Sequence, residues 1–168
     1  MRLKHKNLEI RLANINDADY LLKYWTESGW DITLKEAQER LTKNREQHMI
    51  EVDGRIIGDI HYGELENNTA EIGIYIRDER EKGKGYGLST TCIYIDALIK
   101  FMGYDKIRIA TSVDNDAMRH ISETKLNLSP TIHTDAYQEQ LGTHEPYVEY
   151  ILEKENWQNN ICYEFLDS

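Results

Sequence analysis

The fold is decided by residues 70–102, which read AEIGIYIRDEREKGKGYGLSTTCIYIDALIKFM. An apolar run at 72–76 predicts a strand, a charged loop occupies 77–82, and three alternate glycines lead into a long apolar-periodic segment typical of a helix. A glycine-rich turn between a strand and a helix is typical of phosphate binding, because glycine lets the backbone approach the anion and the unpaired amides at the helix start point toward it. The stretch therefore predicts an anion site.

The spacing of the glycines separates three kinds of phosphate-binding turn. A P-loop requires Ser or Thr after a Gly-Lys pair, and neither follows such a pair here. A dinucleotide-binding turn requires GxGxxG directly after the strand, whereas six polar residues separate the strand from Gly83. The remaining pattern is R/Q-x-x-G-x-G/A after a strand, and it fits in two registers, Arg80-x-x-Gly83-x-Gly85 and Lys82-x-x-Gly85-x-Gly87. We prefer the second register, because it puts the last glycine at the helix start.

This turn resembles that of the GCN5-related N-acetyltransferase (GNAT) family, whose turn holds the pyrophosphate of acetyl-coenzyme A. Lys82 stands where the family usually has Arg or Gln. Two downstream tracts extend the resemblance: KIRIATSVDNDAMRHISETKL at 106–126 and PYVEYILEKENW at 146–157. The resemblance implies a GNAT-like α+β fold with a mixed, twisted central sheet flanked by helices, and a domain over 1–155 followed by a tail over 156–168.

The remaining elements follow from hydrophobic periodicity and turn residues. A strand at 8–13 precedes a helix that Asn14 or Asn16 caps and that ends at 28–29, and a second helix spans 33–44. Asp53-Gly54 between two apolar runs predicts a hairpin, so three antiparallel strands lead into the glycine turn. The predicted strands and helices are 49–52, 56–62 and 70–76, then helix 85–102 with Met102 on its apolar face, strand 107–110, helix 116–125, and strands 131–133 and 147–152. The resemblance places the cofactor where the fourth and fifth strands, 72–76 and 107–110, splay apart.

Composition limits the class of partner. The formal net charge is −10, which argues against nucleic acid and is compatible either with a cationic substrate or with a charge that only maintains solubility. No apolar run is long enough for a membrane helix, and the N-terminus lacks the apolar stretch of a signal peptide. With only Cys92 and Cys162, a reducing compartment, the cytoplasm, is expected. Neither CxxC nor HExxH occurs, so no metal site is indicated.

The resemblance implies a set of cofactor-binding residues. Backbone amides of the turn would hold the phosphates, and an amide on the preceding strand would hold the thioester oxygen. Asn115 matches an Asn that contacts coenzyme A in the family, although an ordinary helix cap is the alternative. Lys84 and Tyr86 either contact phosphate or face solvent. The residues assigned to the cofactor are Ile74, Tyr75, Ile76, Lys82, Gly83, Lys84, Gly85, Tyr86, Gly87 and Asn115.

Acetyl transfer to an amine also needs a base, because a primary amine is protonated at neutral pH. Glu71 starts the strand before the turn and resembles a family glutamate, so we expect it to act as the base. The alternative is that Glu71 pairs across the sheet or faces solvent.

The leaving thiolate also needs a proton donor. Many family members place a tyrosine on the helix after the Asn, where this chain has Ile121 or Ser122. A thiol has a pKa of about 8.5, so the thiolate leaves without a strong acid at some cost in rate. Ser122 is the assigned substitute, and His120, Tyr137 and Tyr147 are the alternatives.

The acceptor and the reaction class are less closely defined. The resemblance suggests that Trp30 and Asp31 contact the acceptor, although Trp30 as a packing aromatic is the favoured interpretation. Asp135, Glu139, Glu145 and Glu149 form a loose acidic set that either attracts a cation or is merely solvated. The acceptor is expected to be a primary amine of a small molecule or a peptide.

Two other functions are considered. A non-catalytic acyl-coenzyme A-binding module is the main alternative, and a nucleotide-binding domain is disfavoured. The tail over 156–168 either packs on the domain or forms a homodimer contact.

Overall fold

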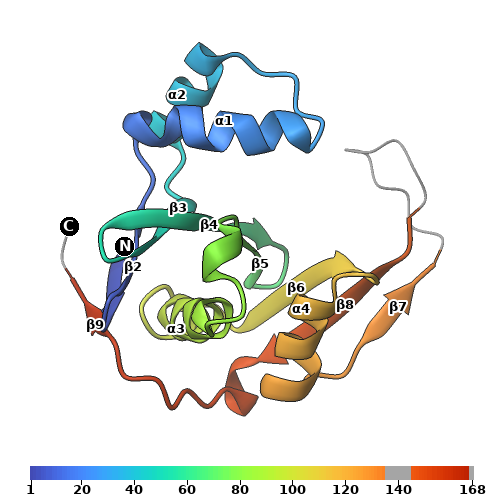
Figure 1. Cartoon of the computed structure of the whole chain (residues 1–168). Coiled ribbons are helices and arrows are strands. Elements are labelled where there is room, and N and C mark those ends of the chain that lie inside the picture. Colours follow the sequence, from blue (N-terminus) through green and yellow to red (C-terminus); the bar gives the residue numbers. More distant parts are fainter. Residues whose placement is uncertain (135–144, 167–168) are drawn as a thin grey trace.

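The computed structural model describes residues 1–134 and 145–166, in which one mixed sheet carries helices on both faces (Figure 1). The strands are β1 (Arg2–His5), β2 (Leu8–Leu12), β3 (Gln47–Val52), β4 (Arg55–Leu65), β5 (Thr69–Ile76), β6 (Lys106–Ser112), β7 (Thr131–His133), β8 (Tyr147–Glu153) and β9 (Glu164–Phe165). The helices are α1 (Ala18–Glu27), α2 (Leu34–Lys43), α3 (Tyr86–Lys100) and α4 (Asp116–Arg119), with a π-helical turn, η3 (His120–Lys125), after α4 and single 3-10 turns elsewhere. Asp135, Tyr137 and Glu139 lie outside the described residues.

The strands follow the order β7-β8-β6-β5-β4-β3-β2-β1-β9. Neighbouring strands of the described sheet run antiparallel, with the exception of β5 and β6, which run parallel. The predicted meander of three strands is therefore confirmed as β3, β4 and β5. The strands β1 and β9 were not predicted.

The parallel pair is short, and this is the feature that positions the site. β5 and β6 pair at four positions only, from Thr69 with Lys106 to Ile72 with Ile109. Beyond this point β5 stays paired with β4 as far as Ile76, while β6 stays paired with β8. The two strands therefore part after Ile72, which is the splay that the family resemblance predicted.

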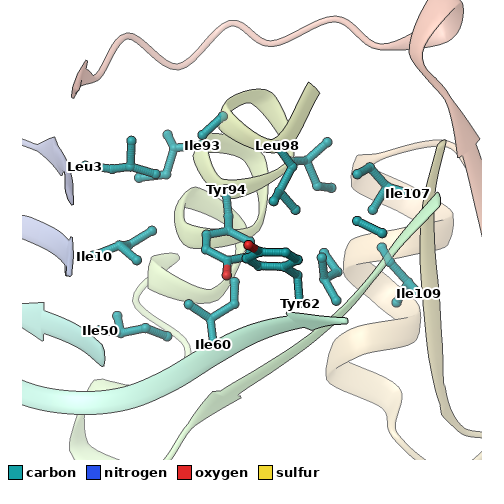
Figure 2. Packing of buried hydrophobic residues seen from close by; sticks show 14 of the residues in the cluster. Leu3, Ile10, Ile50, Ile60, Tyr62, Ile93, Tyr94, Leu98, Ile107 and Ile109 are labelled. Atoms are coloured by element: carbon teal, nitrogen blue, oxygen red, sulfur yellow. The ribbon is translucent and has the colours of Figure 1, made fainter. Parts of the chain in front are cut away.

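α3 packs its apolar residues onto one face of the sheet. Figure 2 shows Ile93, Tyr94 and Leu98 of α3 pointing at strand residues that include Ile60 and Ile107. All of these side chains are buried, and burying a large aliphatic or aromatic side chain stabilises the fold by about 1.5–3 kcal/mol.

The end of α3 corrects one prediction. The helix ends at Lys100, two residues earlier than predicted, and Met102 is exposed instead of lying on the buried face. Gly103 then adopts a positive φ of 79°, which reverses the chain just after the helix.

α1 and α2 cover part of the opposite face, which we call the α1/α2 face. Their buried residues, including Leu21 and Leu41, form a second apolar cluster with Met49 of β3. The Asn14 side chain caps the short turn that leads into α1, and Thr33 with Glu36 forms a capping box at the start of α2. No helix in the described part of the chain is long and apolar enough to cross a lipid bilayer.

The C-terminal tail packs on the rest of the chain. The indole Nε1 of Trp157 donates to Asp96 at 2.8 Å, and the Tyr163 hydroxyl donates to the same carboxylate at 3.0 Å. Asp96 belongs to α3 and is buried. β9 then extends the sheet by pairing with β1. Of the two predicted roles for the tail, packing on the domain is the one seen in this structure.

Candidate active site

A cleft of about 770 Å³ opens where β5 and β6 part. Its walls are the splayed end of β5, the glycine-rich turn, the start of α3, and α4 with η3. The residues that line it are Tyr24, Glu27, Ile74, Tyr75, Ile76, Arg77, Glu79, Lys82, Gly83, Gly85, Gly87, Leu88, Asn115, Ala117, Met118, His120, Ile121 and Lys125. Many of these were predicted from the sequence to bind a cofactor.

The glycine turn forms a cradle at the start of α3. Gly83 and Gly85 have φ values of 76° and 88°, in the left-handed region that other residues rarely adopt. A Cβ atom added to either glycine would meet no atom within 4 Å, so the space beside the backbone is open. Gly85 is the N-cap of α3 and supplies no side-chain cap, so the first amides of the helix remain available to an anion.

The two lysines of the turn have different positions. Lys82 lines the cleft and forms an ion pair with Glu79 at 2.5 Å. Lys84 lies outside the cleft lining and pairs with the buried Glu81 at 3.0 Å. Glu81 also accepts from Arg55 of β4 at 2.5 Å, so it ties the turn to the sheet. The structure therefore places Lys82 in the cleft wall beside the glycine turn and gives Lys84 a structural contact.

Tyr86 and Gly87 begin α3 and face different surroundings. The Tyr86 hydroxyl accepts from the Asn7 side chain at 3.4 Å, so it is directed away from the cleft. A Cβ atom added to Gly87 would lie 3.4 Å from Cδ1 of Ile121 and 3.9 Å from Cγ1 of Ile76. Gly87 therefore allows α3, η3 and β5 to approach one another at the cleft.

The free edge of β5 supplies backbone donors. Arg77 donates its N–H to the carbonyl of Ile57 on β4 at 2.8 Å. Because successive N–H groups along a strand point in opposite directions, those of Ile74 and Ile76 point to the edge that β6 has left. The predicted residues Ile74, Tyr75 and Ile76 all line the cleft. No described strand pairs with this part of the edge, so its amides are available to an oxygen that enters the cleft.

The opposite wall begins at Asn115. Its side-chain oxygen accepts from the N–H of Met118 at 3.1 Å, and its Nδ2 donates to Thr111 at 2.8 Å. Asn115 is therefore the helix cap, and it also lines the cleft, while its contact with coenzyme A stays a prediction. His120 and Ile121 follow on the same wall, in the wide turn of η3.

Glu71 lies outside this cleft, on the α1/α2 face of β5. It belongs to the part of β5 that is still paired with β6, directly opposite Arg108. Its carboxylate forms an ion pair with the Arg108 guanidinium, which also donates to Glu149 of β8 at 2.5 Å. Glu71 thus occupies the cross-strand pair that was the alternative to its predicted catalytic role, and it lies two residues before the strands part.

The candidates for a proton donor are scattered. Ser122 is fully buried, lies outside the cleft lining, and its hydroxyl has no hydrogen-bond partner among the described residues. Tyr147 stacks on His133, with ring centroids 4.6 Å apart, on the far side of β6 from β5. Among the candidates inside the described residues, His120 alone lines the cleft.

Arg77 closes the cleft beside α1 and was not predicted. Its guanidinium carbon lies 4.3 Å from the ring centroid of Tyr24 and 4.2 Å from that of Tyr75, and its Nε donates to the buried Asp59 at 2.8 Å. Such cation–π contacts fix the geometry of the group. Sequence reasoning also missed Tyr24, Glu27, Glu79 and Lys125, because only the folded chain brings them to this opening.

Trp30 and Asp31 lie outside the cleft lining. Trp30 stacks on Trp25, with ring centroids 5.6 Å apart, and the guanidinium of Arg40 lies 4.7 Å from its ring centroid. Trp30 is thus engaged in packing, as favoured from the sequence. Cys92 is buried in α3, where burial raises the pKa of its thiol to about 11, so the thiol stays protonated at neutral pH.

The cleft fits a ligand that carries both phosphate and a polarised carbonyl. An uncapped helix start beside an open backbone cradle suits the phosphates, and the free edge of β5 suits the oxygen. Lys82 and Lys125 add positive charge to the lining. This combination of features is what the cofactor predicted from the sequence requires.

Comparisons with known proteins test the family resemblance. No curated protein matches the sequence significantly. Among solved structures, an acetyltransferase of the GNAT family from Bacillus anthracis superposes with a TM-score of 0.76 at 15% identity, over 92% of this chain and 99% of the other. RimL, a ribosomal-protein α-N-acetyltransferase in complex with coenzyme A, gives 0.73 at 17% identity, over 88% and 94%. A chimera of the Vibrio cholerae spermidine N-acetyltransferase SpeG with hSSAT gives 0.72 at 16%, over 89% and 97%.

These structural similarities, all below 25% identity, establish the fold. A sequence model described as acetyltransferase (GNAT) domain matches residues 7–124, which is more than half of the chain. The match begins before β2 and ends within η3, so it includes both walls of the cleft. The chain therefore belongs to the GNAT family of acetyltransferases, the family that its glycine-rich turn predicted.

Proposed function

We propose that this protein transfers the acetyl group of acetyl-coenzyme A directly to a primary amine. The observation that carries the proposal is the cleft at the parting of β5 and β6, with an uncapped helix start at one end and free strand amides along one edge. GNAT acetyltransferases use acetyl-coenzyme A. When bound, this cofactor supplies an acetyl group on a thioester, which a neutral amine attacks.

Different residues of the chain would bind different parts of acetyl-coenzyme A. The amides of the turn and of the first turn of α3 would hold the phosphates, with Lys82 as a nearby cation. The amides of Ile74 and Ile76 would orient the carbonyl and stabilise the charge that develops on its oxygen. Asn115 would hold the far wall in place through its cap. Lys84 and Tyr86 would contribute structural contacts.

The acceptor is proposed to be an amine of a protein or of a small molecule. Of the similar structures, one is named as a protein α-N-acetyltransferase and one as a spermidine N-acetyltransferase, and these represent the two classes. A net charge of −10 favours attraction of a cationic amine. We further propose a cytoplasmic location, in keeping with two free cysteines.

Glu71 and Ser122 remain the sequence-based candidates for base and acid. Ser122→Ala tests the second role, because loss of turnover at unchanged affinity for acetyl-coenzyme A would support a proton donor. Equal turnover would remove Ser122 from the mechanism and leave His120, which lines the cleft. Glu71→Gln is compared below with a second candidate base.

The first experiment is thermal unfolding with and without acetyl-coenzyme A, with ATP and NAD as controls. A ligand at 100 times its dissociation constant stabilises a protein by about 2.7 kcal/mol. For a chain of this length we expect the midpoint to rise by about 5–10 °C with acetyl-coenzyme A and to stay unchanged with the controls. A shift with ATP or NAD but not with acetyl-coenzyme A would contradict the assigned cofactor.

The second candidate function is a non-catalytic module that binds acyl-coenzyme A. Its specific support is the wall formed by α4 and η3, where Ile121 or Ser122 stands in place of the tyrosine that many family members have. An amine panel that includes spermidine and peptides with free N-termini separates the two functions. Release of free thiol that depends on the amine supports the enzyme, whereas tight binding without release of thiol supports the module.

A further inference from the structure

The side chain of His61 lies over the point where β5 and β6 part. His61 of β4 is the cross-strand partner of Gly73, the first residue of β5 beyond the last pair with β6. A Cβ atom added to Gly73 would lie 2.5 Å from Cε1 and 2.8 Å from Nε2 of His61. The tip of the imidazole therefore occupies the space that a side chain at position 73 would fill, which brings Nε2 across to β5 beside the splay.

Neighbouring groups fix the orientation of this ring. The Tyr75 ring stacks on it, with centroids 6.2 Å apart and planes 19° apart. Tyr75 lines the cleft and is itself covered by the guanidinium of Arg77, which the buried Asp59 holds. Positions 73, 75 and 77 share one face of β5, because successive residues of a strand face opposite sides of the sheet. His61 itself is not among the residues that line the cleft, and Tyr75 and Arg77 connect it to that lining.

The surroundings of His61 favour its neutral form. Burial lowers the pKa of the imidazole below its usual 6.5. Asp59 on the same strand opposes this effect and raises the pKa, whereas Arg40 of α2 and Arg77 at the end of β5 lower it further. Above pH 6.5 the ring is therefore uncharged, with one ring nitrogen free to accept a proton.

We propose that His61 is the group that takes the proton from the acceptor amine, which approaches the splay from the α1/α2 face. This inference rests on the proposed function. The position of the ring over Gly73, its fixed orientation and its neighbours in the cleft carry it. No step requires a metal or a second cofactor.

The reaction balances with the groups named. The amine nitrogen forms a bond to the acetyl carbonyl carbon while the carbon–sulfur bond breaks. The sulfur keeps the electron pair of the broken bond and takes up the proton that the attacking nitrogen loses as it becomes the amide, so that it leaves as thiol. The ammonium form of the amine has one proton more than the neutral amine that attacks, and Nε2 of His61 receives this proton and returns it to solvent. The amide and the free thiol are the products.

Glu71 is less suited to this task. Its carboxylate forms an ion pair with Arg108, so a proton that arrives there would have to break an existing contact. It also lies in the paired part of β5, whereas Gly73 and the ring above it lie at the parting. Glu71 and Arg108 would instead maintain the geometry of the short parallel pair.

The test compares His61→Gln with His5→Gln. His5 lies on β1 and contacts the carbonyl of Cys162 in the tail, far along the sheet from β5, so it serves as a matched control. Acetyl-coenzyme A and an active amine from the panel are the substrates. We expect His61→Gln to lower kcat by about 100-fold or more, as loss of a general base does, and His5→Gln to leave it unchanged.

The pH profile distinguishes a base from a merely structural residue. In the unsubstituted protein, kcat should be level above pH 6.5 and should fall below it as the imidazole gains a proton. In His61→Gln, kcat should keep rising as the pH increases up to the pKa of the amine itself, about 10, because only the amine that is already neutral reacts. The opposite result would assign the base to Glu71: kcat would then be independent of pH above 6.5 in His61→Gln, but would keep rising with pH in Glu71→Gln.

A readout that does not depend on turnover completes the test. NMR titration of the histidine rings, with His61 assigned by its loss in His61→Gln, should show a pKa below 6.5 in the free protein. Gly73→Ala should displace the ring and lower kcat while the variant still binds acetyl-coenzyme A, which keeps the inference testable if His61→Gln fails to fold. A normal or raised pKa, or full activity in Gly73→Ala, would overturn it. If the unsubstituted protein turns over no amine, the proposed function fails and this inference fails with it.

Discussion

Position 85 favours glycine for two reasons, its backbone conformation and its place in the glycine turn. Its φ of 88° disfavours any side chain, and its position as the N-cap of α3 puts it in the cleft lining, where we propose that the phosphates bind. A residue with a side chain here would suffer backbone strain of roughly 1–2 kcal/mol and would also occupy the open cradle. These two effects can be separated, because Gly54 has a similar φ of 74°, with open space around it, in the β3–β4 turn outside the cleft.

We predict that Gly85→Glu abolishes binding of acetyl-coenzyme A, whereas Gly54→Glu does not. Both variants carry the strain and the added negative charge, but only the first places a carboxylate beside the phosphates. Calorimetric titration with acetyl-coenzyme A measures the affinity, and thermal unfolding confirms that both variants fold. Normal affinity in Gly85→Glu would show that the glycine turn is not the phosphate site.

At individual positions, the sequence predicted the cleft lining around the glycine turn better than the lining beside α1. Lys82, Gly83 and Gly85 line the cleft because their motif is local and sets its own backbone geometry. The contacts that direct Lys84 and Tyr86 elsewhere come from Glu81 and Asn7, and no spacing rule indicates them. His61 was missed for the same reason, since its proposed role depends on the missing side chain at Gly73, its partner on the neighbouring strand.

Among the elements, β3 and α3 are joined by a buried polar contact. The hydroxyl of Tyr94 lies 3.0 Å from Nδ1 of His48, and both side chains are buried in the core. Nε2 of His48 has no hydrogen-bond partner among the described residues. Burial lowers the pKa of His48 to about 3, so the ring is neutral in the folded protein at any physiological pH.

This pair predicts a loss of stability in acid. The pKa of His48 is lower in the folded state than in the unfolded state, so the stability is fully present above pH 6.5 and is lost as the pH falls from 6.5 toward 3. At pH 5 the loss is on the order of 2 kcal/mol relative to pH 7. Urea unfolding at the two pH values measures it. His48→Gln should reduce this difference, whereas a difference that persists in full would point to other groups.

Element boundaries show where sequence patterns fail. The strands β3, β4 and β5 were predicted because Asp53-Gly54 marks a tight turn between apolar runs. β1 was missed because only Leu3 in it is a buried apolar residue, and β9 because it is two residues long and exposed. Counting by helical spacing gave Ile121 or Ser122 for the place of the missing tyrosine, and these two neighbours in the π-helical turn η3 differ in the structure. Ser122 was expected near the cofactor, but the structure buries it and leaves His120 and Ile121 on the wall.

At the scale of the whole molecule, the tail connects the two ends of the chain. Asp96 in the middle of α3 accepts from Trp157 and Tyr163, and β9 pairs with β1 beyond them. Lys100 also pairs with Asp96, at 2.9 Å, but its side chain is 59% exposed. Asp96 is therefore the point at which the tail is fixed to the domain.

We predict that Asp96→Ala lowers the free energy of unfolding by about 2–3 kcal/mol, because it leaves two donors without their charged acceptor. The melting midpoint should fall by roughly 5–10 °C. Lys100→Ala is the control, since an exposed ion pair contributes at most about 1 kcal/mol. Affinity for acetyl-coenzyme A should be unchanged in both variants. Equal effects of the two substitutions would mean that the tail contributes little.

The short pairing of β5 with β6 has a mechanical consequence. On one side of it lie six strands and on the other three, and the two groups share four residue pairs, the only parallel ones in the described sheet. Under a force that pulls these two groups of strands apart, the four pairs are all the strand pairing in the described sheet that holds the groups together. A ligand that touches the start of α3 on one side and α4 on the other would resist that separation. The energy of binding would then appear as stiffness, and a loaded molecule would bear more tension than an empty one.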